Sequence, residues 1–534
     1  MAALLVPSRG DSTLAFTPAL ARGCRADGFV ATRKGALCRR SSRAAVAALR
    51  CTTTVPASGM ADDQEQKQQH VVSGRDKDKI VKTRITSVAE FRRVIEEGGS
   101  LTTLEVVGDT TIPAGRQTHP VLKVLAKRRA EGSKPLQRSD KYKVALAIEG
   151  GGMRGCVAAG MASALADAGL ADCFDEVYGS SAGSLVGAYW IANSFGMVQY
   201  GASLYYDLLT GKASKKYFID KTRALTLLGF DFLRIFTKRS MQEMLGLREK
   251  GLPLLNLQYL LRSCVEDMRP LDWQGYSARD SLIPLHIIAS DVVSKKAVCL
   301  SRKNGDWTSI RGMTKCMAAS MNLPAIAGPL VQLDSLPRAL LADAQLFEPV
   351  PFKSALANGC THVLVLRTRP DGIDCMPRPS KVEAGMMRNF FADMTDVADY
   401  LVSMKHKEVY CEDVLRLNEA TLHPASEEGN GAPSPQLLTI ALPEGVEEIG
   451  RLERGRDMIF GGVKQGYASA VRVLTSQPGL WPEAFAGLAP EQAADRAFPA
   501  DLLKEEPSLS RSAWFDTYLK RSADMRLDNT DPTM

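Results

Sequence analysis

The stretch Val144-Ala145-Leu146-Ala147-Ile148-Glu149-Gly150-Gly151-Gly152-Met153-Arg154-Gly155 decides the fold of this chain. Its first five residues are all apolar, which is typical of a strand buried on both faces in a parallel sheet. The glycines that follow leave backbone N–H groups uncovered where a helix opens, and such a loop is suited to binding a negative charge. The sequence therefore predicts a strand, a glycine loop and a helix in direct succession.

A second strand-like stretch, Phe174–Tyr178, is followed by Gly179-Ser180-Ser181-Ala182-Gly183. The pattern Gly-x-Ser-x-Gly places its serine on a tight turn between a strand and a helix, where the glycines relieve crowding. Ser181 is therefore a candidate nucleophile, and the N–H groups of Gly151 and Gly152 are candidate donors to an oxyanion. Together the two motifs supply what acyl transfer requires.

A dinucleotide site is an alternative interpretation, because the glycine loop also matches Gly-x-Gly-x-x-Gly. That site needs an acidic residue at the far end of the second strand to bind a ribose. Asp175 and Glu176 lie at the start of that strand, and its end carries Ser181. We therefore favour acyl transfer over nucleotide binding, and also over glycines that serve packing alone.

The two motifs, together with the later run Ala319-Ser320-Met321-Asn322-Leu323-Pro324-Ala325-Ile326-Ala327-Gly328-Pro329, resemble the patatin-like phospholipase family. The resemblance covers about residues 120–475. It implies an α/β fold with a mostly parallel central sheet flanked by helices, a three-layer sandwich with a helical C-terminal extension. It also implies a lipid acyl hydrolase with a Ser–Asp dyad and no catalytic histidine.

In that family the catalytic aspartate precedes a glycine and, a few residues later, a Pro-Val or Val-Pro step. The matching stretch here is Leu341–Pro351, which makes Asp343 the base and puts Ala344 where the family has glycine. If that position requires a positive φ, Ala344 strains Asp343; if φ is negative, alanine is tolerated. The expected oxyanion hole comprises Gly150, Gly151 and Gly152, with Arg154 holding the loop.

The histidines leave a second catalytic arrangement open. His286 and His362 lie in apolar strand-like runs and are expected in the core, while His406 is expected at a solvated helix end. Only His423, in a loop, fits the Ser–Asp–His order of other hydrolases. One alternative is therefore an esterase that uses His423. The other, suggested by Ala344 in place of the family's glycine, is a catalytically weak lipid-binding protein on the same fold.

Charge and composition mark off the N-terminal 60 residues. They carry the whole net charge of +7, are rich in Ala, Ser and Thr, and lack the apolar core of a secretory signal. We expect a transit peptide, for a plastid or alternatively for a mitochondrion. The remaining chain is electrically balanced, which argues against nucleic acid as a partner.

The rest of the chain is expected to form a catalytic enzyme domain between less ordered segments. The eleven cysteines show no Cys-x-x-Cys pair, so we expect no metal, no cofactor and no disulfide framework. No apolar run is long enough to span a membrane. The expected segments are 61–140 as linker and N-terminal helical extension, 141–370 as catalytic domain, 371–476 as helical C-terminal extension and 477–534 as a partly disordered tail.

Two features suggest contact with lipid. A predicted helix places Met387, Phe390, Phe391, Met394, Val397, Leu401 and Met404 along one face, which favours packing but also suits a lid. Basic residues between Lys215 and Arg239 surround apolar ones, as on a surface that docks onto anionic lipid. The sequence thus predicts a carboxylic ester hydrolase that cleaves glycerolipids, phospholipid or galactolipid, at a membrane or lipid-droplet surface.

Overall fold

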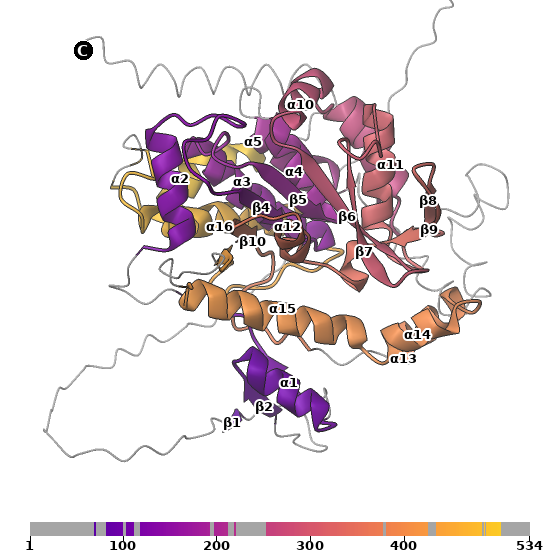
Figure 1. Ribbon diagram of the computed structural model, residues 1–534. Coiled ribbons are helices and arrows are strands. Elements are labelled where there is room, and N and C mark those ends of the chain that lie inside the picture. Colours follow the sequence, from indigo (N-terminus) through magenta and orange to yellow (C-terminus); the bar gives the residue numbers. More distant parts are fainter. Residues whose placement is uncertain are drawn as a thin grey trace, which may run out of the picture. The chain divides into compact units, whose positions relative to one another are not determined.

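A central sheet of eight strands organises the protein (Figure 1). The computed structural model describes residues 69–70, 82–99, 103–111, 118–192, 197–211, 218–219, 253–376, 381–425, 434–482, 485 and 487–503. The strand order is β11-β10-β4-β5-β6-β9-β8, with β7 also paired to β6. The five strands from β11 to β6 are mutually parallel, whereas β7, β8 and β9 join by antiparallel pairs. The expected α/β fold with a mostly parallel sheet is confirmed.

The strands agree closely with the apolar runs of the sequence. The β4 strand occupies the predicted residues, while β5 starts two residues later than expected because Asp175 turns its side chain onto Val144 N (2.7 Å). The bounds are β4 Val144–Ile148, β5 Glu176–Ser180, β6 Leu285–Asp291, β7 Lys296–Ser301, β8 Val331–Leu333, β9 Leu336–Ala342, β10 His362–Leu366 and β11 Gln436–Ile440.

Helices cover both faces of the sheet, because the buried β4 strand presents alternate residues to each side. Val144, Leu146 and Ile148 join a core with α3, α4 and α16, whereas Ala145 and Ala147 join a core with α12 and α15. The bounds are α2 Pro120–Ala130, α3 Gly155–Asp167, α4 Ala182–Ala192, α5 Met197–Ser203, α10 Trp273–Asp280, α11 Ile310–Met321, α12 Phe352–Ala357, α15 Lys405–Leu422, α16 Arg456–Thr475 and α17 Pro490–Ala497. Shorter or wider turns are η2 Gly152–Arg154, η3 Leu204–Leu208, η6 Tyr259–Met268, η7 Ala344–Leu346 and η9 Ala500–Leu503.

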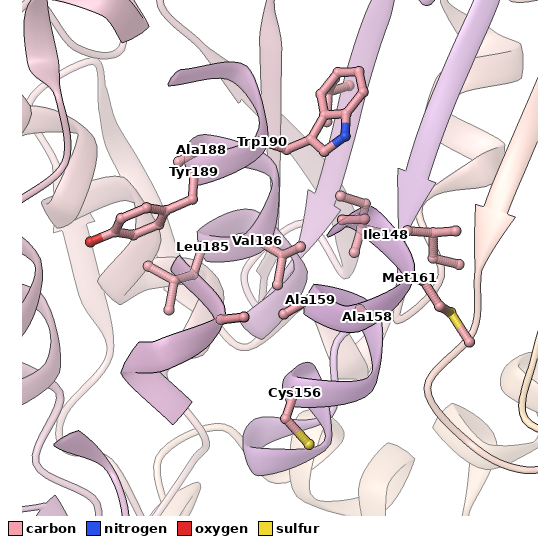
Figure 2. Close-up of a cluster of buried hydrophobic side chains, with 14 of the residues drawn as sticks. Ile148, Cys156, Ala158, Ala159, Met161, Leu185, Val186, Ala188, Tyr189 and Trp190 are labelled. Atoms are coloured by element: carbon pink, nitrogen blue, oxygen red, sulfur yellow. The ribbon is translucent and has the colours of Figure 1, made fainter. Parts of the chain in front are cut away.

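The helices that follow the two motifs share one apolar cluster (Figure 2). Small residues of α3, among them Ala158 and Ala159, let α4 approach and pack Leu185 and Val186 against it. The ring of Trp190 meets Phe174 edge-on, with centroids 5.5 Å apart. This packing fixes the two helices whose N-termini carry the glycine loop and Ser181.

The C-terminal part of the chain completes the central sheet. Strand β11 pairs with β10, and α16 packs along α3, where Gly160 and Gly466 permit close backbone approach. The described residues from Gln69 onward belong to one compact unit. A helix was expected over Glu447–Leu474, but α16 begins only at Arg456, so the prediction was wrong for the first part of this range. Residues 443–455, which contain Gly445, Gly450 and Gly455, instead form a loop beside the glycine motif.

The predicted helix with the Met/Phe face is two helices, α13 (Lys381–Phe390) and α14 (Thr395–Val402). Phe391, Val397 and Leu401 are buried against Ala342 and Leu346, so this face packs on the catalytic domain. Near the N-terminus, β1 (Gln69–His70), β2 (Lys82–Ile85), α1 (Val88–Glu96) and β3 (Leu104–Val106) form a small separate sheet with one helix.

Several expected features lie outside the described residues. These are the transit peptide at 1–60, the basic patch between Lys215 and Arg239, and the tail beyond residue 503. Among the residues that the structure does describe, no helix is long and apolar enough to cross a membrane.

Candidate active site

Ser181 sits on a sharp turn between β5 and α4 and adopts φ +50°, a conformation that L-residues rarely take. The turn is possible because its glycines accept close backbone contacts. A Cβ atom on Gly179 would lie 2.5 Å from Ser184 Cα, and one on Gly183 would collide with Ile148 O. The backbone N–H of Ser181 donates to Ser320 Oγ at 2.8 Å, which fixes the turn from the side of α11.

Asp343 directly follows β9, which is separated in the sheet by β6 from β5, the strand that precedes Ser181. Ser181 Oγ donates a hydrogen bond to Asp343 Oδ2 at 2.8 Å. The N–H of Gln345 holds the other oxygen, Oδ1, at 2.9 Å, and the N–H of Asp343 itself donates to Asn322 O. The carboxylate is therefore aimed at the hydroxyl by a backbone hydrogen bond.

Burial sets the acidity of this carboxyl group. Asp343 is only 2% exposed. Burial raises the pKa of Asp343 to about 6, against the opposing hydrogen bonds from Gln345 and Ser181. A carboxylate with such a pKa is ionised at neutral pH and is a stronger base than an exposed aspartate.

Ala344 causes no backbone strain at this position. It begins the short helix η7, is fully buried, and is absent from the described residues with positive φ. Of the two possibilities for Ala344, the second therefore applies: φ is not positive, and the local backbone tolerates alanine.

The glycine loop lies beside the serine turn, since Ile148 at the end of β4 pairs with Gly179 in β5. Gly151 and Gly152 have φ of +155° and +61°, and a Cβ on Gly152 would lie 2.7 Å from Arg451 O. Among the described residues, no acceptor is assigned to the N–H of Gly151 or Gly152. Gly150 differs, because its N–H donates to Pro349 O at 3.2 Å. Two of the three predicted glycines thus retain available donors.

Arg154 closes the loop on its other side. Its N–H donates to Gly151 O at 3.2 Å, and its guanidinium forms an ion pair with Glu448. The residue is 5% exposed, yet its Nε has no hydrogen-bond partner. Arg154 therefore contacts the loop through its backbone and has a buried side-chain donor, Nε, without a partner.

These groups line a cavity of about 450 Å³. Its walls are unequal in character. Apolar side chains from α4, η6 and α11, and from the residues that follow η3, precede η6 and follow α11, form one part: Leu185, Leu209, Leu255, Leu257, Leu260, Met321 and Leu323. Polar and charged side chains from the chain after β10, from α15 and from the loop before α16 form the other: Arg369, His406, Lys407, Tyr410, Glu448 and Arg451.

The histidines differ from expectation in one case. His423 ends α15 and lines a separate surface hollow with Thr86 and Arg416, not the cavity of Ser181. His406, expected at a solvated helix end, lies in the cavity wall and has an unpartnered Nδ1. Burial lowers the pKa of His406 to about 4, so its imidazole is neutral at pH 7.

Several residues of the site were not predicted as site residues from the sequence. Ser320 belongs to a run that resembled the family, and its hydroxyl in turn donates to Ile288 O. Arg369, Glu448 and Arg451 come from segments far along the chain and meet only in the folded protein. Glu149 is held by the hydroxyl groups of Thr368 and Tyr410 at 2.9 and 2.7 Å.

Part of the chain matches a known protein family. Residues 146–356 match the family model described as patatin-like phospholipase, so the chain carries a patatin-like phospholipase domain. This family implies a lipid hydrolase. A comparison with curated proteins found no match.

Two solved structures are similar to this chain at low identity. VipD from Legionella pneumophila is 13% identical, with 73% of this chain and 81% of that chain covered and a TM-score of 0.30. Human GIVD cytosolic phospholipase A2, in complex with methyl gamma-linolenyl fluorophosphonate, is 14% identical, with 75% and 63% covered and a TM-score of 0.30.

Proposed function

We propose that this protein is a serine lipid acyl hydrolase in which Ser181 and Asp343 form a catalytic dyad. The observation that carries the proposal is the 2.8 Å hydrogen bond from Ser181 Oγ to Asp343 Oδ2. It lies in the wall of a 450 Å³ cavity whose other lining residues include a row of leucines. Such a cavity suits an ester of a long acyl chain.

Catalysis would begin with proton transfer. Asp343 removes the proton of Ser181 Oγ as that oxygen attacks the ester carbonyl. The negative charge that develops on the carbonyl oxygen is stabilised by the N–H groups of Gly151 and Gly152. Asp343 then returns the proton to the leaving alcohol, which leaves an acyl group on Ser181. A water molecule, activated by the same carboxylate, hydrolyses this acyl ester and restores both residues.

The strained serine turn supports this role. A non-glycine residue at φ +50° costs roughly 1–3 kcal/mol, and such conformations concentrate at functional sites. The turn also places Ser181 at the N-terminus of α4, where the helix dipole favours developing negative charge. Both features fit a nucleophile and have no evident packing purpose.

A fluorophosphonate probe tests the nucleophile directly. We expect the probe to form a covalent adduct on the peptide that contains Ser181, as located by mass spectrometry. Asp343→Asn should slow labelling at least about a hundredfold, since the hydroxyl loses its base. Ser180→Ala is the matched control, because Ser180 Oγ donates to Glu348 O (2.8 Å) and not to Asp343. Labelling of Ser181 should therefore proceed normally in this variant. An adduct on another residue, or none on Ser181, would refute the proposal.

We also propose that residues 1–60 direct the protein to a plastid, where glycerolipid membranes would offer substrate to a peripheral enzyme. The support is compositional, since this segment carries the net charge of the chain. A fusion of residues 1–60 to a fluorescent protein should accumulate in plastids. Mitochondrial or cytosolic fluorescence would show the proposed address to be wrong.

A further inference from the structure

The loop of residues 443–455, between β11 and α16, reaches both halves of the proposed catalytic machinery through one residue, Arg451. This loop lies outside residues 146–356, the part that matches the family model. Apolar side chains on either side of Arg451 anchor it, since Ile449 is 3% exposed and Leu452 packs against the same core cluster. Arg451 is therefore presented to the site from a well-anchored stretch of backbone.

The backbone of Arg451 contacts the glycine loop. Met153 N donates to Arg451 O at 3.1 Å, and a Cβ atom on Gly152 would lie 2.7 Å from the same oxygen. Gly152, whose N–H is an expected oxyanion donor, directly precedes Met153 in the chain. The carbonyl group of Arg451 thus restrains the stretch of backbone that carries the expected oxyanion hole.

The side chain of Arg451 contacts the turn that carries the base. Its Nη1 donates to Gln345 Oε1 at 2.7 Å. Gln345 is also the residue whose backbone N–H holds Asp343 Oδ1 at 2.9 Å. The contact with Arg451 therefore acts on the residue that orients the catalytic carboxylate.

The turn η7 is only three residues long, and it is held at two places. Leu346 is buried, and Tyr400 of α14 donates its hydroxyl hydrogen to Leu346 O at 3.2 Å. Gln345 instead lines the cavity, where its side chain accepts from Arg451. Because hydrogen bonds from a charged donor are stronger than neutral ones, this contact restrains the turn on the side of the cavity.

The positive charge of Arg451 also favours the basic form of Asp343. Burial raises the pKa of Asp343, whereas hydrogen bonds from Gln345 and Ser181, and then the charge of Arg451, oppose this rise. Asn322 O, which accepts from Asp343 N, is an uncharged group, as are Gln345 and Ser181. Among the described residues, Arg451 is therefore the cation that acts on this carboxylate.

We infer that Arg451 is a positioning residue for the Ser181–Asp343 dyad, whose side chain holds the base through Gln345 and whose backbone holds the glycine loop. The inference rests on the proposed function, since it assumes that Asp343 is the base for Ser181. It extends the functional site to a loop beyond the matched family domain. It also gives a role to a side-chain hydrogen bond between residues 106 positions apart in the sequence.

Steady-state kinetics with the full-length protein and p-nitrophenyl butyrate test this role. The ester has no charged headgroup, so binding of a headgroup by Arg451 does not contribute. We expect Arg451→Met to lower kcat about tenfold with little change in KM, because the carboxylate is less well placed. The inflection of kcat/KM against pH should move to a higher pH, since Asp343 loses a nearby positive charge. Arg451→Lys should keep the inflection close to that of the wild type and recover only part of kcat.

Gln345→Ala separates an action through the turn from a general effect of charge. This variant keeps the backbone N–H but removes the acceptor for Arg451, so kcat should fall by a similar factor. The double variant of Arg451→Met and Gln345→Ala should be little worse than either single one. Additive losses would show that the two residues act independently and would overturn the inference. Arg454→Met is the matched control, because it changes the same loop outside the cavity lining and should alter neither kcat nor the inflection.

Folding and the proposed function are checked separately. Arg451 is exposed, so we expect Arg451→Met to unfold at the same temperature as the wild type, and Gln345→Ala provides the same kinetic test if it does not. Ester hydrolysis that persists in Ser181→Ala would mean that the proposed function fails, and the inference with it. If Ser181→Ala is inactive while Arg451→Met keeps the wild-type kcat and pH inflection, the inference alone is wrong.

Discussion

The backbone N–H of Gln345 donates to Oδ1 of Asp343 at 2.9 Å, so that Oδ2 alone faces Ser181. Nucleophile and base therefore act as a unit. We predict that Ser181→Ala and Asp343→Asn each reduce kcat for a carboxylic ester by at least about 10³-fold, and that the double variant is little worse. Steady-state kinetics with each variant check this. Substantial turnover in Asp343→Asn would exclude Asp343 as the base.

Asp343 should also govern the pH dependence of activity. Because burial raises its pKa to about 6, the base is protonated below that value. We predict that kcat/KM rises about tenfold per pH unit up to pH 6 and is level above it. A profile without an inflection near pH 6 would show that another group supplies the base.

The same shift predicts how stability changes with pH. A carboxyl group whose pKa is higher in the folded than in the unfolded protein binds protons more strongly when folded, so its contribution falls as pH rises from about 4 to 6. Asp343→Asn removes this cost. The variant should be more stable than wild type at pH 8, by up to about 3 kcal/mol, and equally stable below pH 4. Urea denaturation at both pH values measures the difference.

Gly151→Ala should impair the oxyanion hole. Its Cβ would lie 2.9 Å from Thr368 Oγ1 at a φ of +155°, which forces the loop to move. Loss of one donor costs about 3–4 kcal/mol in comparable sites, so kcat should fall a hundredfold or more. Gly461→Ala is the control, since nothing lies within 4 Å of the added atom. Unchanged kcat in Gly151→Ala would assign this glycine to packing alone.

Ala344→Gly should give no gain in activity. The residue occupies a helical turn without positive φ, so glycine relieves nothing. It also increases the freedom of the unfolded chain, and we expect a loss of about 0.5–1 kcal/mol in unfolding free energy. Thermal denaturation and kcat are the measurements. A raised kcat would mean that Ala344 does restrain Asp343.

His423→Ala should leave ester hydrolysis unchanged. His423 lines a hollow with Ser87 and Glu419, away from the cavity that contains Ser181. Kinetics on the same ester, with the Ser181→Ala protein as the inactive reference, provide the check. If the variant lost activity while it kept its fold, a Ser–Asp–His mechanism would have to replace the dyad.

Local motifs made part of this structure predictable. The β4 strand and the serine turn depend mainly on residues that are close in the sequence, so the local sequence is enough to predict them. The β8 and β9 strands were missed because one is only three residues long and the other contains Pro337 and Arg338. Such short, polar strands have no clear alternation. They form because β9 pairs with β6, and β8 then pairs with β9.

The charged wall of the site could not be predicted for a different reason. Glu447–Leu452 has the spacing of charged and apolar residues that favours a helix, but tertiary contacts hold it as a loop. Met153 N donates to Arg451 O at 3.1 Å, and no sequence pattern within either segment predicts this hydrogen bond. Contacts between residues that lie far apart in the sequence become visible only in the folded structure.

The central position of β4 has a consequence for biosynthesis. It pairs with β5 on one side and with β10 on the other, and β10 in turn requires β11. The ribosome synthesises β4 and β5 long before β10. During translation, one edge of the fully apolar strand β4 therefore stays unpaired until β10 is made. Strands with an unpaired edge are prone to aggregation. A fragment ending near residue 356 would keep that open edge permanently, and successful expression of the catalytic domain should therefore require the chain through α16.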